Sequence, residues 1–237
     1  MQCVILAGGL GTRMRPFTDT CPKTLLPVHG RPFAYHQVHW LAAQGVRQVV
    51  YAIGHQGEMI RRYWESEPPP VSIAYVDEGN RLRGTGGALR LAREQGALEE
   101  AFFVIYGDSF LPVEFAPIWQ GFQKSGMPAL MTVLRNEGRW DRSNTIYTDG
   151  RVALYDKKAN AAMQYIDYGL SAFRRELFGE DAPEVFDLAD LLHDLSLEGR
   201  LAGFEVRERF YEIGSPAGLH DLEEYLQGRE TAAVSPR

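Results

Sequence analysis

Hydrophobic residues in the first half of the chain gather in short unbroken runs, and amphipathic stretches with helical spacing separate these runs. Short apolar runs bounded by glycine or proline are typical of buried strands, whereas apolar positions three or four residues apart are typical of helices that cover a sheet. The runs predict strands at residues 3–7, 48–53, 71–76, 102–106 and 129–134. The stretches between them predict helices at residues 32–43, 56–64, 85–94 and 115–124.

This alternation predicts an α/β fold. Strands that are apolar at nearly every position are buried on both faces, so we expect a mainly parallel, Rossmann-like sheet with helices on both sides. Ligands of such sheets bind at the carboxyl ends of the strands. The glycine-rich segment after Ala7 and the pair Gly107-Asp108 both follow a predicted strand, so the binding site is expected there.

The second half of the chain has a different pattern. Residues 146–155 predict a hairpin with a type I′ turn at Asp149-Gly150, and residues 165–173 predict another extended segment. Helices are expected at 188–197 and at 215–226.

These elements predict a single domain over residues 1–228, with a sugar-binding lobe embedded in it. Nucleotide binding is expected mostly in 1–135 and acceptor binding mostly in 136–214. Residues 229–237 are expected to form a flexible tail.

The composition narrows the classes of partner. The 237 residues are 45% hydrophobic, which is enough for a sizeable core, and their net charge of −6 argues against a nucleic-acid protein. No basic leader opens the chain, and no apolar run reaches the roughly 18 residues of a membrane helix. With only two cysteines the chain suits a reducing compartment, so we expect a cytoplasmic protein without a membrane partner. The oligomeric state stays open, a homo-oligomer included.

The glycine-rich segment from Leu6 to Arg13 carries the strongest chemical signal. Its glycines let backbone N–H groups approach a bulky anion, and Arg13 and Lys23 add cations, so the segment suits a polyphosphate. A dinucleotide fingerprint needs a third glycine where Met14 stands, and an ATPase P-loop needs Gly-Lys-Ser/Thr, whereas Lys23 follows Pro22.

The residues Gly8 to Pro16 read Gly-Gly-x-Gly-Thr-Arg-Met-x-Pro, and Pro22-Lys23 lies downstream. This pattern resembles the signature of the sugar-1-phosphate nucleotidylyltransferases, also called NDP-sugar pyrophosphorylases. The resemblance implies Mg²⁺-dependent transfer of a nucleotidyl group from a nucleoside triphosphate to a sugar-1-phosphate. The Ala-Gly-Gly start, together with Gly84 to Leu89, looks closest to guanylyltransferases that act on mannose- or heptose-1-phosphate.

The resemblance also implies roles for single residues. Arg13 would contact the β- and γ-phosphates, and Lys23 would stabilise charge at the α-phosphate, as the catalytic pair. The residues expected to bind the nucleotide are Leu6, Ala7, Gly8, Gly9, Gly11, Thr12, Glu78, Gly86 and Asp108. Backbone N–H groups near Gly86, at the start of a helix, are expected to read the base.

Metal and acceptor residues are implied in the same way. Asp108 and Glu212 would hold Mg²⁺, although Glu212 stands where the family usually has aspartate, and Asp108 alone also suits a helix N-cap. The sugar phosphate would be bound by Lys158, with Asp167 and Gly169 beside the sugar.

Two other functions stay open on the residues alone. A cytidylyltransferase acting on phosphocholine would need an aromatic cage, to which Trp140, Tyr165 and Tyr168 are candidates. A non-catalytic nucleotide-sugar sensor would explain Glu212, and also Lys157 at a position where the family usually has glutamate.

Overall fold

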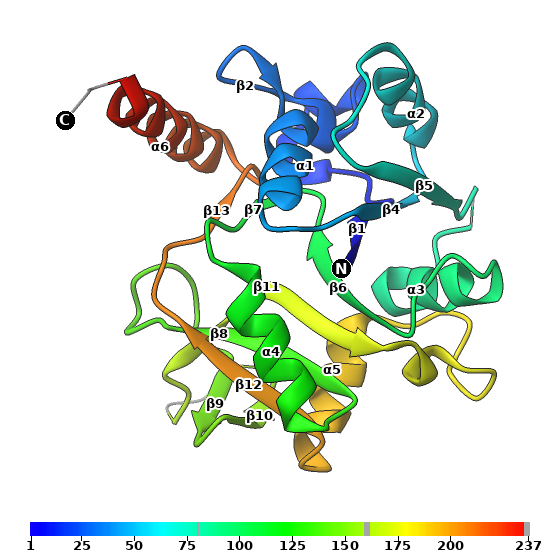
Figure 1. The fold of residues 1–237 in the computed structure, drawn as a ribbon, viewed down its shortest axis with the longest axis vertical. Coiled ribbons are helices and arrows are strands. Elements are labelled where there is room, and N and C mark those ends of the chain that lie inside the picture. The colour runs from blue at the N-terminus through cyan, green and yellow to red at the C-terminus, as the bar shows by residue number, and fades with distance from the viewer. Residues whose placement is uncertain (80, 159–161, 235–237) are drawn as a thin grey trace.

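The protein is described here by a computed structural model covering residues 1–79, 81–158 and 162–234. Nine strands form one sheet in the order β5-β4-β1-β6-β11-β8-β12-β10-β9 (Figure 1). Its first half is parallel, and β4, β1 and β6 are largely apolar because they are covered on both faces, whereas the edge strand β5 is only partly buried. The strands of this half are β5 (Ser72–Asp77), β4 (Gln48–Ile53), β1 (Gln2–Ala7) and β6 (Ala101–Tyr106).

The other half of the sheet is mixed. Its first strand runs antiparallel to β6 and so joins the two halves through main-chain hydrogen bonds. The strands of this half are β11 (Tyr165–Arg174), β8 (Ala129–Arg135), β12 (Leu201–Val206), β10 (Arg151–Tyr155) and β9 (Thr145–Thr148). Two small antiparallel pairs lie outside this sheet, β7 (Ser109–Phe110) with β13 (Tyr211–Glu212) and β2 (Pro27–Val28) with β3 (Arg31–Pro32).

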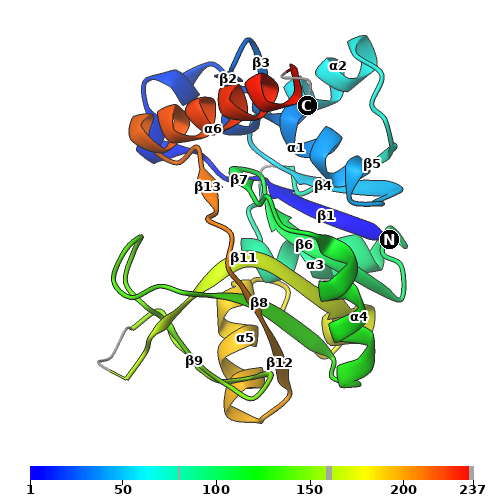
Figure 2. The same cartoon turned by 60° about the vertical axis from the view of Figure 1, so that its left-hand side comes forward.

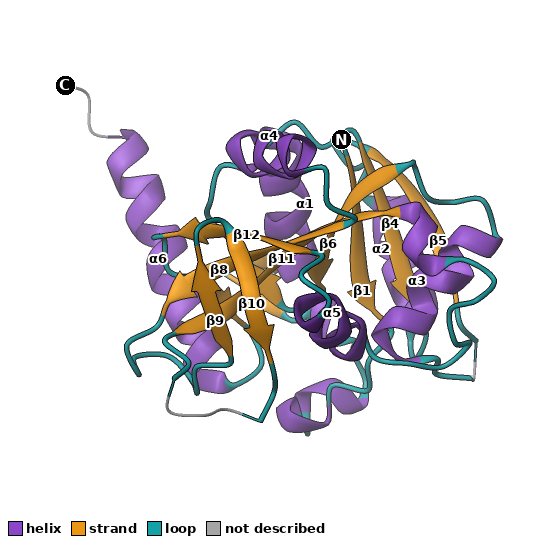
Figure 3. Cartoon of the chain, turned by 90° about the horizontal axis from the view of Figure 1, so that it is seen from below, coloured by secondary structure: helices purple, strands orange, loops and turns teal. Residues whose placement is uncertain are grey.

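Helices cover both faces of the sheet, as Figure 3 shows for α4 and α5. One buried cluster joins the sheet to α1, α2 and α4, and a second joins it to α3 and α5. Strand β1 serves both, because Cys3 and Ile5 face the first cluster and Val4 faces the second. The helices are α1 (Phe33–Ala43), α2 (Gly57–Ser66), α3 (Gly84–Glu94), α4 (Phe115–Ser125), α5 (Leu188–Leu197) and α6 (Pro216–Val234).

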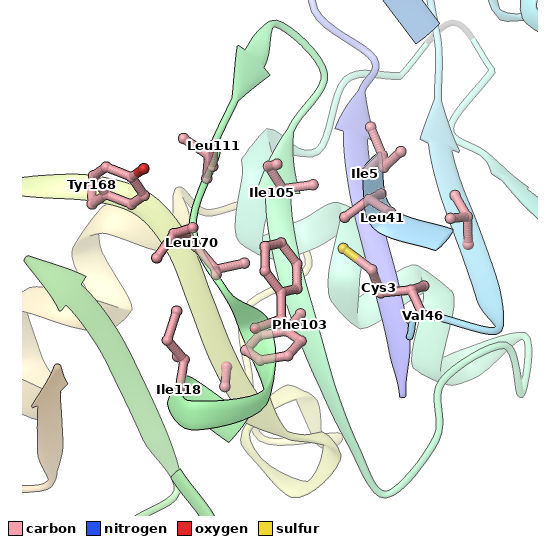
Figure 4. Close-up of a cluster of buried hydrophobic side chains, with 14 of the residues drawn as sticks. Cys3, Ile5, Leu41, Val46, Phe103, Ile105, Leu111, Ile118, Tyr168 and Leu170 are labelled. Carbon is pink, nitrogen blue, oxygen red and sulfur yellow. The ribbon is translucent and has the colours of Figure 1, made fainter. Parts of the chain in front are cut away.

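The first cluster also crosses the boundary between the two halves. Ile5 and Ile105 come from the parallel half, and Tyr168 and Leu170 come from β11, yet all four side chains belong to the same buried group (Figure 4). The strand ends that form the site are therefore fixed relative to one another by a shared core.

The expected α/β class is confirmed, and every predicted strand and helix is present with its ends shifted by a few residues. The sheet is mixed, however, rather than parallel throughout. The predicted type I′ turn is present, with φ of 48° at Asp149 and 77° at Gly150.

Some elements differ from the sequence-based expectation. The short strands β2, β3, β7 and β13 were not predicted. Strand β12 was not predicted either, since Gly203 interrupts its apolar pattern; a Cβ at this position would lie 2.6 Å from the Tyr147 ring. Helix α6 runs to Val234, past the predicted end at residue 226, and lies beside β2 (Figure 2). Its Leu222 is fully buried against Val28 and Phe33, and this packing stabilises a helix whose sequence is only weakly amphipathic.

In the part of the chain that the structure describes, no helix has both the length and the apolar character needed to cross a membrane.

Candidate active site

A cavity of about 270 Å³ opens at the carboxyl ends of β1 and β6, where the fold class predicts a ligand. Eight of its lining residues were expected from the sequence, namely Leu6, Ala7, Gly8, Gly9, Gly11, Lys23, Glu78 and Asp108. Gly107 was expected there as the neighbour of Asp108, and the segment from Gly84 to Leu89, which supplies Gly84, Thr85 and Ala88, was expected near the base. The remaining lining residues were not singled out, namely Thr24, Ala52, Leu82, Tyr106 and Asp187.

The glycines of the cavity wall are needed for close approach. A Cβ on Gly8 would lie 2.9 Å from Oε1 of Glu78, and one on Gly107 would lie 3.0 Å from the carbonyl oxygen of Leu6. Gly11 has a φ of 62°, in the left-handed region that suits glycine. The wall is therefore largely backbone, which leaves room for a ligand and exposes N–H groups to it.

Charged groups from distant segments meet at one end of the cavity. Nζ of Lys23 lies 2.7 Å from Oδ2 of Asp108, and both side chains are largely shielded from solvent. The β7–β13 pair places Glu212 opposite Ser109, and the N–H of Ile213 donates to the carbonyl of Asp108 at 2.9 Å. The carboxylate of Asp108, in the turn before β7, and that of Glu212, on β13, therefore lie on neighbouring segments.

Arg13 completes this charged group. A Cβ on Gly214 would lie 3.8 Å from Nη2 of Arg13. The positive charge of Arg13 acts to lower the pKa of Glu212. Desolvation, followed by repulsion from Asp108, raises the pKa of Glu212 to about 7, while Arg13 and Lys23 oppose the shift. Two cations and two carboxylates, 199 residues apart at their extremes (Arg13 to Glu212), thus converge on one spot.

The carboxylate pair fits a cation that is shared with a ligand. Among residues 1–79, 81–158 and 162–234, no group of three His, Cys, Asp or Glu could hold a metal ion. Magnesium in phosphoryl-transfer sites commonly takes one or two carboxylates and completes its shell with phosphate oxygens and water. Asp108 and Glu212 supply this donor set, and the raised pKa of Glu212 reflects its desolvation and the repulsion between the two carboxylates, which a bound cation would relieve.

On the acceptor side, β11 presents Asp167 and Gly169. Oδ1 of Asp167 accepts the N–H of Gly169 at 2.9 Å, and the N–H of Asp167 donates to Oδ1 of Asn144 at 2.9 Å. Gly169 has a φ of 94°, and the pairing of β11 with β8 is interrupted between Asp167 and Ser171. Desolvation raises the pKa of Asp167 to about 6, against the opposing effects of the Gly169 N–H and of Lys157. No local pattern marks Asn144, because its contact with Asp167 depends on the neighbouring strand.

The two lysines of this region differ from expectation. Lys157 is the cation that lowers the pKa of Asp167. Lys158, the lysine expected at the sugar phosphate, is exposed, as Lys157 is, and its backbone N–H donates to Oδ1 of Asp156 at 2.7 Å. Of the two lysines, Lys157 is the one whose charge acts on Asp167.

The expectation for Gly86 needs a correction. The N–H groups of Gly86 and Gly87 donate to the carbonyl of Phe186 at 3.0 and 3.2 Å, so they are not available to read a base. Gly86 is a glycine because the Phe186 ring packs against it. Thr85 and Ala88, from the same helix, line the cavity in its place. Thr12 begins a short 3₁₀ turn and is exposed beside the glycine loop.

The candidate aromatic cage for a quaternary amine is not assembled. Tyr168 is 2% exposed and packs edge-on against Phe210 in the core. The face of Trp140 is covered by the guanidinium of Arg209, and Tyr165 packs against Tyr147. A choline headgroup would need these ring faces to be free.

A model of the nucleotidyl transferase family matches residues 2–146, which include the glycine loop, Asp108 and every lining residue of the cavity except Asp187. The chain belongs to the nucleotidyl transferase family. Within this family, the chain is 30% identical over 230 residues to the D-glycero-alpha-D-manno-heptose 1-phosphate guanylyltransferase of Aneurinibacillus thermoaerophilus, covering 96% of this chain and 99% of that one. The enzyme of the same name from Campylobacter jejuni is 27% identical, with 91% and 96% covered.

Solved structures share the fold of this family member. HddC from Yersinia pseudotuberculosis, complexed with GMP-PN, superimposes with a TM-score of 0.77 at 21% identity, covering 95% of this chain and 99% of that one. A UDP-glucose pyrophosphorylase complexed with UDP-glucose gives a TM-score of 0.76 at 17% identity, with 96% and 98% covered.

Proposed function

We propose that the protein transfers the guanylyl group of GTP to a manno-configured sugar-1-phosphate, giving a GDP-sugar and pyrophosphate. The chain is a sugar-1-phosphate nucleotidylyltransferase, a family that makes NDP-sugars from nucleoside triphosphates. One observation carries the proposal, the convergence of Arg13, Lys23, Asp108 and Glu212 beside a glycine-walled cavity that Lys23 and Asp108 line. The proposal adds to this reaction type the identity of the base, guanine, and of the sugar, which has the manno configuration.

The arrangement explains how the reaction can proceed without a protein nucleophile. An oxygen of the sugar phosphate attacks the α-phosphorus in line, the bond from that phosphorus to the bridging oxygen breaks, and pyrophosphate leaves with the electron pair. The attacking oxygen is already ionised, so no base is needed. Lys23 stabilises charge at the α-phosphate and Arg13 stabilises the departing pyrophosphate, so catalysis rests on positioning and electrostatics.

The metal site follows from the same geometry. Asp108 and Glu212 would hold Mg²⁺, which would neutralise charge on the phosphate oxygens between the two substrates. Lys23 bonds to Asp108 in the ligand-free chain, so each side chain already points toward the place where the α-phosphate is proposed to lie. This pairing also keeps both charges satisfied until the triphosphate arrives.

Glu78 supports guanine as the base. Its Oε2 accepts the N–H of Arg83 at 2.7 Å, and its Oε1 lies over Gly8 at the cavity wall. Guanine presents two adjacent donors, N1–H and the N2 amino group, which a carboxylate can accept. Uracil and thymine place carbonyl oxygens on both sides of their single N–H, and a carboxylate repels these oxygens. The guanylyltransferases similar to this chain agree with this assignment.

The acceptor is proposed to lie between Lys157 and Asp167. Lys157 would bind the sugar phosphate, while Asp167 and the open space beside Gly169 would accept sugar hydroxyls. The proposed role thus moves from Lys158 to its neighbour.

The test is pyrophosphate release in the presence of Mg²⁺, measured for ATP, CTP, GTP, TTP and UTP against several sugar-1-phosphates and phosphocholine. Release with GTP and mannose- or heptose-1-phosphate is expected. Release only with CTP and phosphocholine would overturn the proposal in favour of a different acceptor class. Triphosphate-induced thermal stabilisation without release from any pair would indicate a sensor.

A further inference from the structure

The connection between β8 and β9, residues 136–144, forms an ordered arm beside the acceptor. Asn136 organises it, because its Nδ2 donates to the carbonyl of Asp141 at 2.6 Å and its Oδ1 accepts the N–H of Trp140 at 3.1 Å. The arm ends at Asn144, whose N–H donates to Tyr165 at 2.9 Å and whose side chain accepts the N–H of Asp167. We call residues 136–144 the acceptor-side arm.

The tip of this arm rests on an arginine from another part of the chain. The guanidinium carbon of Arg209, in the connection between β12 and β13, lies 4.3 Å from the centre of the Trp140 ring and 4.9 Å from that of Tyr211. The same guanidinium forms an ion pair with Asp221 on α6. Arg209 therefore links the arm, β13 and α6 through two ring faces and one carboxylate.

The strand that Arg209 contacts carries Glu212. Tyr211 is paired with Phe110 in the β7–β13 ladder and stacks on Tyr225 with ring centres 4.6 Å apart. The cations that act on Glu212 itself are Arg13 and Lys23. Arg209 is therefore connected to Glu212 through Tyr211 and the main chain of β13.

We propose that Arg209 is a positioning residue that fixes the acceptor-side arm relative to Glu212. This inference rests on the proposed function, in which Asp167 faces the acceptor and Glu212 faces the metal. The acceptor-side arm contacts Asp167 through Asn144, and Arg209 connects the tip of the arm to Tyr211, which is next to Glu212. A planar guanidinium can stack between two rings while it pairs with a carboxylate, and a lysine ammonium lacks this geometry.

The kinetic test separates Mg²⁺ and acceptor effects from nucleotide effects. Arg209→Lys keeps the charge but loses the stacking. The KM for the acceptor and the Mg²⁺ concentration for half-maximal rate should therefore each rise about three- to tenfold. This range corresponds to the loss of a cation–π contact of about 0.7 to 1.4 kcal/mol. The KM for the triphosphate should stay within about twofold, because the glycine-walled cavity is untouched.

Matched variants control this experiment. Arg207→Lys changes an exposed arginine of the same connection and should leave all constants unchanged. Trp140→Ala should reproduce the effect of Arg209→Lys, whereas Trp140→Phe keeps a ring face and should restore near-wild-type values. In the double variant Arg209→Lys/Trp140→Ala the two effects should not add, because both remove the same contact.

Hydrogen exchange without any substrate gives a readout independent of turnover. Trp140→Ala should speed exchange of the amides of residues 211–213 relative to Trp140→Phe, since the arm no longer braces β13. Equal exchange in the two variants, or an equal rise of every KM in Arg209→Lys, would overturn the inference. If wild type releases no pyrophosphate from any substrate pair, the proposed function fails while the exchange comparison still decides whether the arm and β13 are linked.

Discussion

The nucleotide side and the acceptor side of the site are built from different kinds of sequence. On the nucleotide side, the end of β1 and the loop that follows it supply five of the cavity residues, and parallel strands hold this segment against Asp108. On the acceptor side, Asn144 lies just before β9, Lys157 lies just after β10, and Asp167 lies on β11, all in the mixed half of the sheet. A local motif encodes the first side, whereas strand pairing assembles the second.

This difference explains why the nucleotide side is easier to predict from the sequence than the acceptor side. A loop that binds phosphate through backbone N–H groups needs glycines at fixed spacing, so its function is visible in the residue order. A sugar pocket needs hydrogen-bonding side chains at fixed positions in space, which many residue orders can supply. We therefore expect substitutions on the nucleotide side to lower mainly kcat, and substitutions on the acceptor side to change mainly the KM for the sugar phosphate.

The largest effect is expected for Lys23→Ala on the nucleotide side. It removes the charge proposed at the α-phosphate and leaves Asp108 without its partner, so kcat should fall by at least about a hundredfold. Steady-state pyrophosphate release measures this. Lys124→Ala, an exposed lysine on α4, is the control and should be neutral. Unchanged turnover in Lys23→Ala would exclude its catalytic role.

Two glycines of the cavity wall should separate stability from binding. Gly107→Ala forces a Cβ to 3.0 Å from the Leu6 carbonyl and 3.0 Å from Oγ1 of Thr24. It should cost about 2–3 kcal/mol of unfolding free energy by overpacking. Gly9→Ala meets no atom within 4 Å, so it should leave the Tm unchanged and weaken triphosphate binding by narrowing the cavity.

Thermal unfolding and triphosphate titration of both glycine variants measure the two effects. Equal losses of Tm in the two variants would show that the loop glycines serve folding rather than binding.

On the acceptor side, Asp167→Asn should change how stability depends on pH. The folded-state pKa of Asp167 is raised to about 6, so the native state binds more protons than the unfolded state between about pH 4 and 6. Wild-type stability therefore falls as pH rises through this window, and the ionised carboxylate remains a cost above it. The variant removes this cost and should be more stable than wild type by roughly 2 kcal/mol at pH 8.

At pH 4, where Asp167 is protonated in the native state, the two proteins should unfold at similar denaturant concentrations. Denaturant titrations at pH 4 and pH 8 make the comparison. A constant difference between the two proteins at both pH values would contradict the raised pKa.

The smallest effect is expected for the neighbouring lysines. Lys157→Ala should raise the KM for the sugar phosphate by roughly tenfold, the loss of about one charge-assisted hydrogen bond, with little change in the KM for the triphosphate. Lys158→Ala is its matched control and should change neither constant by more than about twofold. The reverse order would restore the role that the sequence resemblance implied for Lys158.

Much of the parallel half could be read from the chain, because its strands are continuous apolar runs that end at glycines. The acceptor half was harder to predict for physical reasons. Gly203 breaks the pattern of β12 to make room for Tyr147, and Gly86 packs under Phe186 although its sequence context suggested a base contact. In both places a long-range contact, which leaves no local pattern, set the residue type.

The sequence by itself determined the fold class, the phosphate-binding loop and the reaction type, because glycine spacing, apolar runs and charged motif residues act locally along the chain. The tertiary structure decided that Asp108 and Glu212 lie together and that Lys157 is the lysine acting on Asp167. It also decided that Arg209 bridges the acceptor-side arm to β13. These depend on strand order and register, which bring Glu212 beside Asp108 across more than a hundred residues. The charge–charge and stacking energies involved fall off within a few ångströms, so only the folded arrangement can set them.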